Sequence, residues 1–264
     1  MIKVHGFPIN VTMFPDKTSQ VWKLSDELLG ADKCNDDRLI TWNFENEGEL
    51  IHIIQLALLL DEVNGFKPIT LDCPYLVYGR QDKETSNNSC FALEAFCRLF
   101  AGIKELRTFD AHNPAFFENK EVCPFNFVNT LPYKEIESII DGEAIDLIVY
   151  PDKGASSRYP QLSAKYKWAA ADKVRDQLTG EIIGMAMPDI DEDLNILVLD
   201  DLIDGGATPI GLAKEIMKYK PSKLIGYFSH CICSKGTKIV HNAGYSKIFD
   251  KNGLFSENPI TAGL

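Results

Sequence analysis

The sequence lacks the features that mark secreted, membrane and nucleic-acid-binding proteins. It has no CxxC pair, and its seven cysteines are odd in number and lie mostly within apolar runs, which argues against a disulfide framework or a zinc site. No apolar stretch approaches the ~20 residues of a membrane span, and the start MIKVHGFPIN lacks a signal-peptide pattern. Lys and Arg number 27 against 38 Asp and Glu, and this net charge of −11 argues against a nucleic-acid or anionic-membrane partner. We expect a soluble cytoplasmic protein with reduced thiols.

The composition is that of a globular protein with one large domain or two of moderate size. Of the 264 residues, 45% are hydrophobic and 25% are charged, which is enough to bury a core. Apolar segments of strand length alternate with helical patterns, and a weakly patterned stretch at residues 125–143 indicates a boundary. The order predicts an α/β fold of mainly parallel sheets in two domains, residues 1–135 and 136–264, with ligands at the carboxyl ends of the strands.

The segment ILVLDDLIDGGATP, between two predicted strands, combines adjacent carboxylates with a glycine loop and a helix start. The glycines permit positive φ, and Thr208 followed by proline is typical of a helix N-cap. Amides at a helix N-terminus favour an anion, so the loop predicts a phosphate cradle. Asp200 and Asp201 suit ribose hydroxyls, each of which can donate to a carboxylate, or a bridging cation. The loop therefore predicts a ribose 5-phosphate site.

The same segment resembles the phosphoribosyl-binding motif shared by type I phosphoribosyltransferases and ribose-phosphate diphosphokinases, the PRPP synthetases. Further segments resemble those of the diphosphokinases and occur in the same order. FPDKTSQ resembles their FxDGE loop, VYGRQDK their YxRQDR segment, TFDAHNPAFF their TxDLH segment, VYPDKGA their SPDxGG segment and AADKVR their DKRR stretch. The chain is thus identified as a short, divergent member of this family, matched over residues 8–237, which implies two phosphoribosyltransferase-like (Rossmann-like) halves, each a mainly parallel sheet flanked by helices.

The resemblance implies an enzyme of nucleotide biosynthesis that transfers the β,γ-diphosphoryl group of ATP to the anomeric C1 hydroxyl of ribose 5-phosphate. The products are phosphoribosyl diphosphate (PRPP) and AMP, and Mg²⁺ is the implied cofactor. Charge spreads over the phosphoryl oxygens during such a transfer, so catalysis is mainly positioning and electrostatic stabilisation.

Each matching position takes a role from the resemblance. The implied catalytic cations are Lys173 and Arg175, and the implied metal ligands are His112 and Asp152. The implied ATP-binding residues are Phe14, Asp16, Arg80, Gln81 and Asp82. The implied sugar-phosphate residues are Asp200, Asp201, Asp204, Gly205, Gly206, Ala207 and Thr208.

Two of these assignments depend on the resemblance alone. A lysine and an arginine two residues apart are usually surface charges, and Lys173 and Arg175 can reach one site only from an extended or irregular backbone, such as an arm that closes over ATP. A histidine after a strand is more often a hydrogen-bonded turn residue, and magnesium prefers oxygen ligands. His112 is therefore an unusual ligand by composition alone.

Three departures from the family pattern bear on substrate and regulation. Thr18 stands where the FxDGE loop has glutamate, which removes one adenine contact. Gly205 stands where the family's DTAGT loop has threonine, which removes a hydroxyl donor to the 5-phosphate and leaves room. The chain is also shorter than the family and poorly matched after Gly236, so the resemblance does not extend to a regulatory phosphate and ADP site.

Three alternative functions remain open. The room at Gly205 suits a larger 5-phosphoribosyl acceptor such as ADP-ribose, as in NAD salvage. A phosphoribosyltransferase would lack the ATP-side segments GRQDK, DAH and DKVR, and a non-catalytic regulatory paralogue would lack the cations or metal ligands, so both are less favoured. We expect a homo-oligomer, because the resemblance places the Phe14 loop at the ATP site of a neighbouring subunit, and we expect no nucleic-acid or membrane partner.

Overall fold

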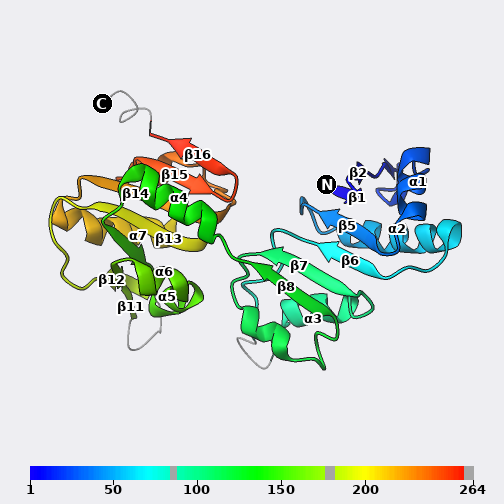
Figure 1. Cartoon of the computed structure of the whole chain (residues 1–264), viewed down its shortest axis with the longest axis horizontal. Helices are drawn as coiled ribbons and strands as arrows, with labels where there is room; N and C mark the ends of the chain where they lie inside the picture. Colours follow the sequence, from blue (N-terminus) through cyan, green and yellow to red (C-terminus); the bar gives the residue numbers. More distant parts are fainter. Residues whose placement is uncertain (84–87, 176–181, 259–264) are drawn as a thin grey trace. The chain divides into compact units, whose positions relative to one another are not determined.

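The computed structural model describes residues 1–83, 88–175 and 182–258, without the side chains of residues 173–175 and 182–183. The chain divides into two compact units, Met1–Thr130 and Leu131–Leu264. Figure 1 shows that each unit has its own sheet and its own helices. Within the described residues, no helix is long and apolar enough to cross a membrane.

The N-terminal unit is built on a six-stranded sheet in the order β2-β1-β5-β6-β7-β8. Strands β5 to β8 are parallel, whereas β1 is antiparallel to both of its neighbours. The sheet strands are β1 (Ile2–Val4), β2 (Phe7–Pro8), β5 (Arg38–Trp42), β6 (Ile69–Asp72), β7 (Glu105–Phe109) and β8 (Asn126–Thr130). A separate hairpin, β3 (Val11–Met13) and β4 (Ser19–Val21), accompanies the helices α1 (Asp26–Cys34), α2 (Glu49–Asn64), α3 (Ala92–Leu99) and η1 (Pro114–Glu118).

The C-terminal unit is built on a second six-stranded sheet in the order β10-β9-β13-β14-β15-β16, parallel except for β16. Its strands are β9 (Leu147–Tyr150), β10 (Trp168–Ala170), β13 (Asn195–Ile203), β14 (Lys223–Cys231), β15 (Lys247–Asp250) and β16 (Gly253–Glu257). A hairpin of β11 (Asp172–Arg175) and β12 (Ile182–Ala186) stands outside this sheet. The helices are α4 (Tyr133–Glu143), α5 (Lys153–Arg158), α6 (Pro160–Lys165), α7 (Ala207–Ile216), η2 (Met217–Tyr219) and α8 (Lys238–His241).

The central strand β13 shows why the sheet is parallel and covered on both faces. Ile196 and Val198 pack in one apolar cluster with α7 and α8, whereas Leu197 and Leu199 pack in another with α4, α5 and α6. Because successive side chains of a strand point to opposite faces, a continuously apolar strand needs helices on both sides. The predicted α/β fold of two mainly parallel sheets is confirmed.

Two element predictions were wrong in detail. The sequence PITLDCPYLVYG, residues 68–79, predicts a strand along its whole length. The strand ends at Asp72, because the Pro74 nitrogen has no hydrogen for a sheet bond and residues 76–79 turn instead, with Gly79 N donating to Leu76 O at 3.1 Å. The weakly patterned stretch at residues 125–143 contains a strand, β8. β8 is an edge strand with little buried surface, so its apolar pattern is weak.

Candidate functional site

The polar loops of the C-terminal unit follow β9, β13 and β14, which are neighbours in the sheet. The carboxyl ends of parallel strands meet at one edge, so these loops share a single rim. Asp200 and Asp201 lie within β13, since the sequence NILVLDD predicts a strand over residues 195–201 and the strand in the structure extends to Ile203. The phosphate-loop residues Asp204 to Thr208 follow directly.

Asp200 and Asp201 are held by an arginine that the sequence analysis did not identify. Arg158 Nη1 lies 2.8 Å from Asp201 Oδ1 and 3.7 Å from Asp200 Oδ1, and the three side chains are only 8%, 6% and 17% exposed in that order. Burial and the neighbouring Asp201 charge raise the pKa of Asp200 well above its usual value, and Arg158 opposes this rise. Asp200 and Asp201 therefore share the guanidinium of Arg158. The available sequence signal was a basic residue six positions after Asp152, at the end of a short helix.

The phosphate loop turns at Gly206, which has φ +79°. A Cβ at Gly206 would lie 3.2 Å from Ile210 Cδ1 and 3.3 Å from Ile239 Cδ1, so both conformation and space favour glycine. The helix α7 begins at Ala207 with Gly206 as its cap, so the prediction of Thr208 as N-cap was wrong. Pro209 is tolerated in the first turn because the amides there have no partner within the helix.

Asp152 caps the helix that follows β9. Its Oδ1 accepts a hydrogen bond from Ala155 N at 2.9 Å. His112 follows β7 in the N-terminal unit, so the two predicted metal ligands belong to different units. No group of three or more His, Cys, Asp and Glu side chains among the described residues is placed to hold a metal. Asp152 by itself offers a carboxylate of the kind that Mg²⁺ takes when water and substrate phosphates complete its shell.

The structure brings together two of the predicted ATP-side loops, those after β6 and β7. Asp82 Oδ2 accepts from Asn113 Nδ2 at 2.8 Å, and Asn113 is the residue after His112. Gln81 N donates to Tyr78 O at 2.8 Å, and Leu93 N at the start of α3 donates to Gln81 O at 3.3 Å. Arg80 is exposed beside them. The RQD and DAHN segments therefore form one loop cluster at the rim of the N-terminal sheet.

The β3–β4 hairpin carries the predicted adenine contacts, and Thr18 acts on one of them. Asp16 Oδ1 accepts from Thr18 Oγ1 at 2.7 Å and from Thr18 N at 3.0 Å, and these hydrogen bonds lower the pKa of Asp16. The threonine that replaces the family's glutamate thus orients the remaining carboxylate.

The hairpin is fixed to α2 by two residues that the sequence analysis did not assign. Gln55 Oε1 accepts from Val21 N at 2.8 Å, and Gln55 Nε2 donates to Ser19 O at 3.2 Å. His52 Nε2 lies 2.6 Å from Ser19 Oγ. Phe14, 38% exposed, borders a hollow of about 470 Å³ beside Gln55 and α2.

Lys17→Gly is expected to stabilise the hairpin slightly. Lys17 has φ +70° at the position where the resembled loop has glycine, and a side chain costs about 1 kcal/mol in that region. The greater freedom of glycine in the unfolded chain offsets part of this, so we expect a net gain of roughly 0.5 kcal/mol. Urea unfolding measures it, with Lys33→Gly in α1 as the matched control, expected to lose about 1 kcal/mol. A Lys17→Gly protein less stable than the parent would contradict the assignment of strain.

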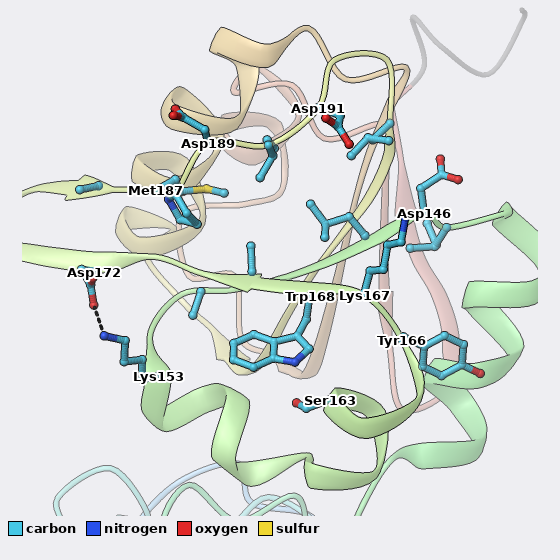
Figure 2. Close-up of a pocket in the computed structure, with 18 of the residues that line it drawn as sticks. Asp146, Lys153, Ser163, Tyr166, Lys167, Trp168, Asp172, Met187, Asp189 and Asp191 are labelled. Carbon is cyan, nitrogen blue, oxygen red and sulfur yellow. Dashed lines mark ion pairs between the residues drawn. The ribbon is translucent and has the colours of Figure 1, made fainter.

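An open cavity of about 1370 Å³ lies along the edge strand β10 (Figure 2). Trp168 lines it and packs edge-on against Tyr150, with ring centroids 5.9 Å apart. Lys153 Nζ lies 3.7 Å from Asp172 Oδ1 at its border, an exposed ion pair marked in Figure 2. Among the predicted site residues whose side chains the structure describes, none lines this cavity. It lies beside the predicted site, since Lys153 follows Asp152 and Asp172 precedes Lys173.

The predicted catalytic cations lie in β11. The backbone there is extended, with Lys173 paired to Met185 and Arg175 to Ile182, and the register shifts between Val174 and Arg175. Their side chains lie outside the described residues. Met185 connects the hairpin to α7, since its Sδ lies 3.3 Å from the position of a Cβ at Gly211.

Comparison with known proteins finds diphosphokinases. No family model matches the chain. The ribose-phosphate pyrophosphokinase of Thermococcus kodakarensis is 29% identical over 194 residues, 70% of this chain and 66% of that protein. The enzyme of Pyrococcus furiosus is 28% identical, and the match covers 70% of this chain and 67% of that protein. The enzyme of Pyrococcus abyssi is 26% identical, and the match covers 89% of this chain and 81% of that protein. The chain thus spans about two thirds of the length of the first two relatives.

A solved structure shows the same architecture over nearly the whole chain. The phosphoribosylpyrophosphate synthetase from Mycobacterium smegmatis superposes with a TM-score of 0.72 and 16% identity, covering 97% of this chain and 82% of that one. Over most of its length the chain is similar to ribose-phosphate pyrophosphokinases, and its fold is that of a phosphoribosylpyrophosphate synthetase. The resemblance inferred from the segments is therefore confirmed. The roles of individual residues in this chain remain predictions.

Proposed function

We propose that the chain is an ATP-dependent ribose-phosphate diphosphokinase, which converts ribose 5-phosphate and ATP to PRPP and AMP. The proposal rests on the arrangement of residues at the end of β13. There Asp200 and Asp201 are followed directly by a glycine turn and the N-terminus of α7. In a chain similar to ribose-phosphate pyrophosphokinases, this arrangement supports binding of a sugar by its hydroxyls and of its phosphate by helix amides.

The proposed roles at the sugar follow from this arrangement. Thr208 and the loop amides from Gly205 to Ala207 hold the 5-phosphate, and Asp204 holds the loop in place. Asp200 and Asp201 accept hydrogen bonds from the ribose hydroxyls, and Arg158 keeps the two carboxylates in position. The C1 hydroxyl oxygen attacks the β-phosphorus of ATP and loses its proton to water, while the bond from the β-phosphorus to the α-phosphate bridging oxygen breaks and AMP leaves.

The proposed roles at ATP belong to the N-terminal unit and the hairpin arm. Phe14 packs on adenine and Asp16 accepts from its amino group, whereas Arg80, Gln81 and Asp82 line the phosphates and ribose. His112 and Asp152 would hold Mg²⁺, which neutralises charge on the phosphate oxygens. Lys173 and Arg175 stabilise the charge that develops on the transferred group.

We also propose a cytoplasmic homo-oligomer. All seven cysteines have free thiols, as a reducing compartment requires. Met13, Phe14 and Trp22 on or beside the hairpin are substantially exposed. An exposed apolar hairpin supports the expectation that it completes the ATP site of a neighbouring subunit.

A second candidate is the same reaction on ADP-ribose. The observation that favours it is the space at Gly205, where a Cβ would meet only Lys235 Cε at 3.9 Å. A diphosphate linked to a second nucleoside needs such an opening beside the proximal phosphate.

One experiment tests both candidates. The protein is incubated with ATP, Mg²⁺ and either ribose 5-phosphate or ADP-ribose, and AMP release is measured. Release with ribose 5-phosphate, abolished by EDTA, is the expected result. Turnover of ribose 5-phosphate without turnover of ADP-ribose would eliminate the second candidate. A protein that releases no AMP with either acceptor would refute the proposed function and favour a regulatory paralogue, and consumption of PRPP with a nucleobase would indicate a phosphoribosyltransferase.

A further inference from the structure

The segment between β14 and α8, residues 232–237, lies against the phosphate loop. Ile232 N donates to Ile203 O at 2.9 Å, and Ser234 N donates to Asp204 Oδ1 at 3.2 Å. Gly236 N donates to Cys233 O at 2.7 Å and closes a turn around Lys235. Cys233 N also donates to Ile203 O, at 3.3 Å, so three backbone amides fix this segment to the two residues before the glycines.

Lys235 fills the space that a side chain at Gly205 would approach. A Cβ at Gly205 would lie 3.9 Å from Lys235 Cε and would meet no other heavy atom within 4 Å. The ammonium is one bond from Cε, so it lies at the Gly205 edge of the phosphate loop. Gly205 itself has no positive φ, so backbone conformation does not explain a glycine there.

The charge of Lys235 is available for a ligand. The residue is exposed, and none of the ion pairs recorded among the described residues involves it, including with the adjacent Asp204. The chain carries a net charge of −11, and carboxylates at 200, 201 and 204 surround the loop. A phosphate placed here would be repelled by these carboxylates, and a neighbouring ammonium offsets that repulsion.

We propose that Lys235 binds the 5-phosphate of the acceptor and supplies the contact that Gly205 cannot. This rests on the proposed function of the phosphate loop. A lysine ammonium is a point charge on a flexible stem, so it can bind a terminal phosphate or a phosphate within a diphosphate linkage. A threonine hydroxyl at position 205 would instead be a short and fixed donor. Lys235 and Gly205 therefore act as a pair that sets which phosphates the loop accepts.

The test uses four proteins: the parent, Lys235→Met, Gly205→Thr and the double variant. Lys235→Met is expected to weaken ribose 5-phosphate binding, measured by calorimetry without ATP, and to raise its KM, each about tenfold, because a charge-assisted contact is lost. The kcat and the KM for ATP should stay within about twofold. Gly205→Thr in the Lys235→Met background should recover most of the affinity, since the new hydroxyl takes over the contact.

Three controls keep the outcomes separate. Lys251→Met, in the turn between β15 and β16, should bind and react like the parent, and Lys235→Arg should retain most of the affinity. Unchanged binding and KM in Lys235→Met would overturn the inference while leaving the diphosphokinase function standing. Parent protein that binds ribose 5-phosphate about tenfold tighter than Lys235→Met, yet releases no AMP, would support Lys235 and refute the reaction. Parent protein that binds neither ribose 5-phosphate nor ADP-ribose would overturn both.

Discussion

Arg158→Met is expected to lower kcat/KM for ribose 5-phosphate by about 100-fold and to destabilise the protein by about 3–5 kcal/mol. Arg158 Nη1 is the partner of Asp201 Oδ1 at 2.8 Å, and both side chains are nearly inaccessible to water. Without the guanidinium, two adjacent carboxylates lie close together without a compensating charge, so they either separate or take up a proton. In both cases they no longer accept hydrogen bonds from the ribose hydroxyls in the parent geometry.

The pH dependence of Arg158→Met distinguishes a role in the site from a purely structural one. Burial and the Asp201 charge raise the pKa of Asp200, whereas Arg158 lowers it, so removing Arg158 raises it further. A carboxyl whose pKa is higher in the folded than in the unfolded chain binds more protons when folded. Its contribution to stability is therefore lost as the pH rises from the unfolded value of about 4 through the folded value. The acid limb of kcat/KM against pH should also move to higher pH.

Two variants calibrate this result. Arg98→Met removes an arginine from an exposed i,i+4 pair with Glu94 and should change stability by no more than about 0.5 kcal/mol. Arg158→Lys keeps the charge and should recover part of the activity. If Arg158→Met unfolds more easily but retains the parent pH profile and KM, Arg158 is only a structural residue.

The sequence allowed the family, the fold class and the loop order to be predicted because these depend on local patterns. The apolar run of β13 indicates a strand buried on both faces, and DDLIDGGAT is contiguous, so its phosphate chemistry can be read without a structure. Gly206 illustrates the limit. Its left-handed conformation moves the start of α7 to Ala207, one residue before the Thr208-Pro209 signal.

Three contacts that the sequence did not predict connect segments far apart in the chain. Arg158 reaches Asp201 across 43 residues, and Lys235 reaches Gly205 across 30. Gln55 holds the Ser19–Val21 strand from a helix 34 residues away. No periodicity or spacing rule encodes such pairs, because they form only when the chain folds. Parallel strands bring the first two pairs to one sheet edge, and the third forms where the β3–β4 hairpin packs on α2.

Thr18 departs from the family pattern, and the structure changes how this departure is interpreted. In the sequence, Thr18 stands where the family has glutamate, so one carboxylate is missing. In the structure its hydroxyl and amide both donate to Asp16, which fixes the carboxylate that remains. Gly205 is similar, since Lys235 Cε from another loop lies 3.9 Å from the position of a Cβ there, and we propose that its ammonium supplies the missing contact. Both departures therefore point to an altered binding site rather than to a lost one.

Lys173→Ala is expected to lower kcat for AMP release by about 10²–10³-fold with little change in the KM for ribose 5-phosphate. A cation that meets the transferred diphosphoryl group only in the transition state affects kcat and not ground-state binding of the sugar. The backbone supports this assignment: Lys173 lies on an extended hairpin outside the main sheet, paired with Met185, which packs on α7 at Gly211. A hairpin that packs on α7, the helix that we propose to bind the 5-phosphate, suits the proposed role of a cation at the transferred group.

Lys165→Ala is the matched control, because Lys165 is an exposed lysine of the same unit that pairs with Glu137 on the surface. It should release AMP at the parent rate, and its stability should change by less than about 1 kcal/mol. Lys173→Arg should retain more activity than Lys173→Ala, since the charge is kept. A Lys173→Ala protein with the parent kcat would remove Lys173 from the mechanism, and Arg175 would then be the cation to test, because it lies on the same strand two residues further along.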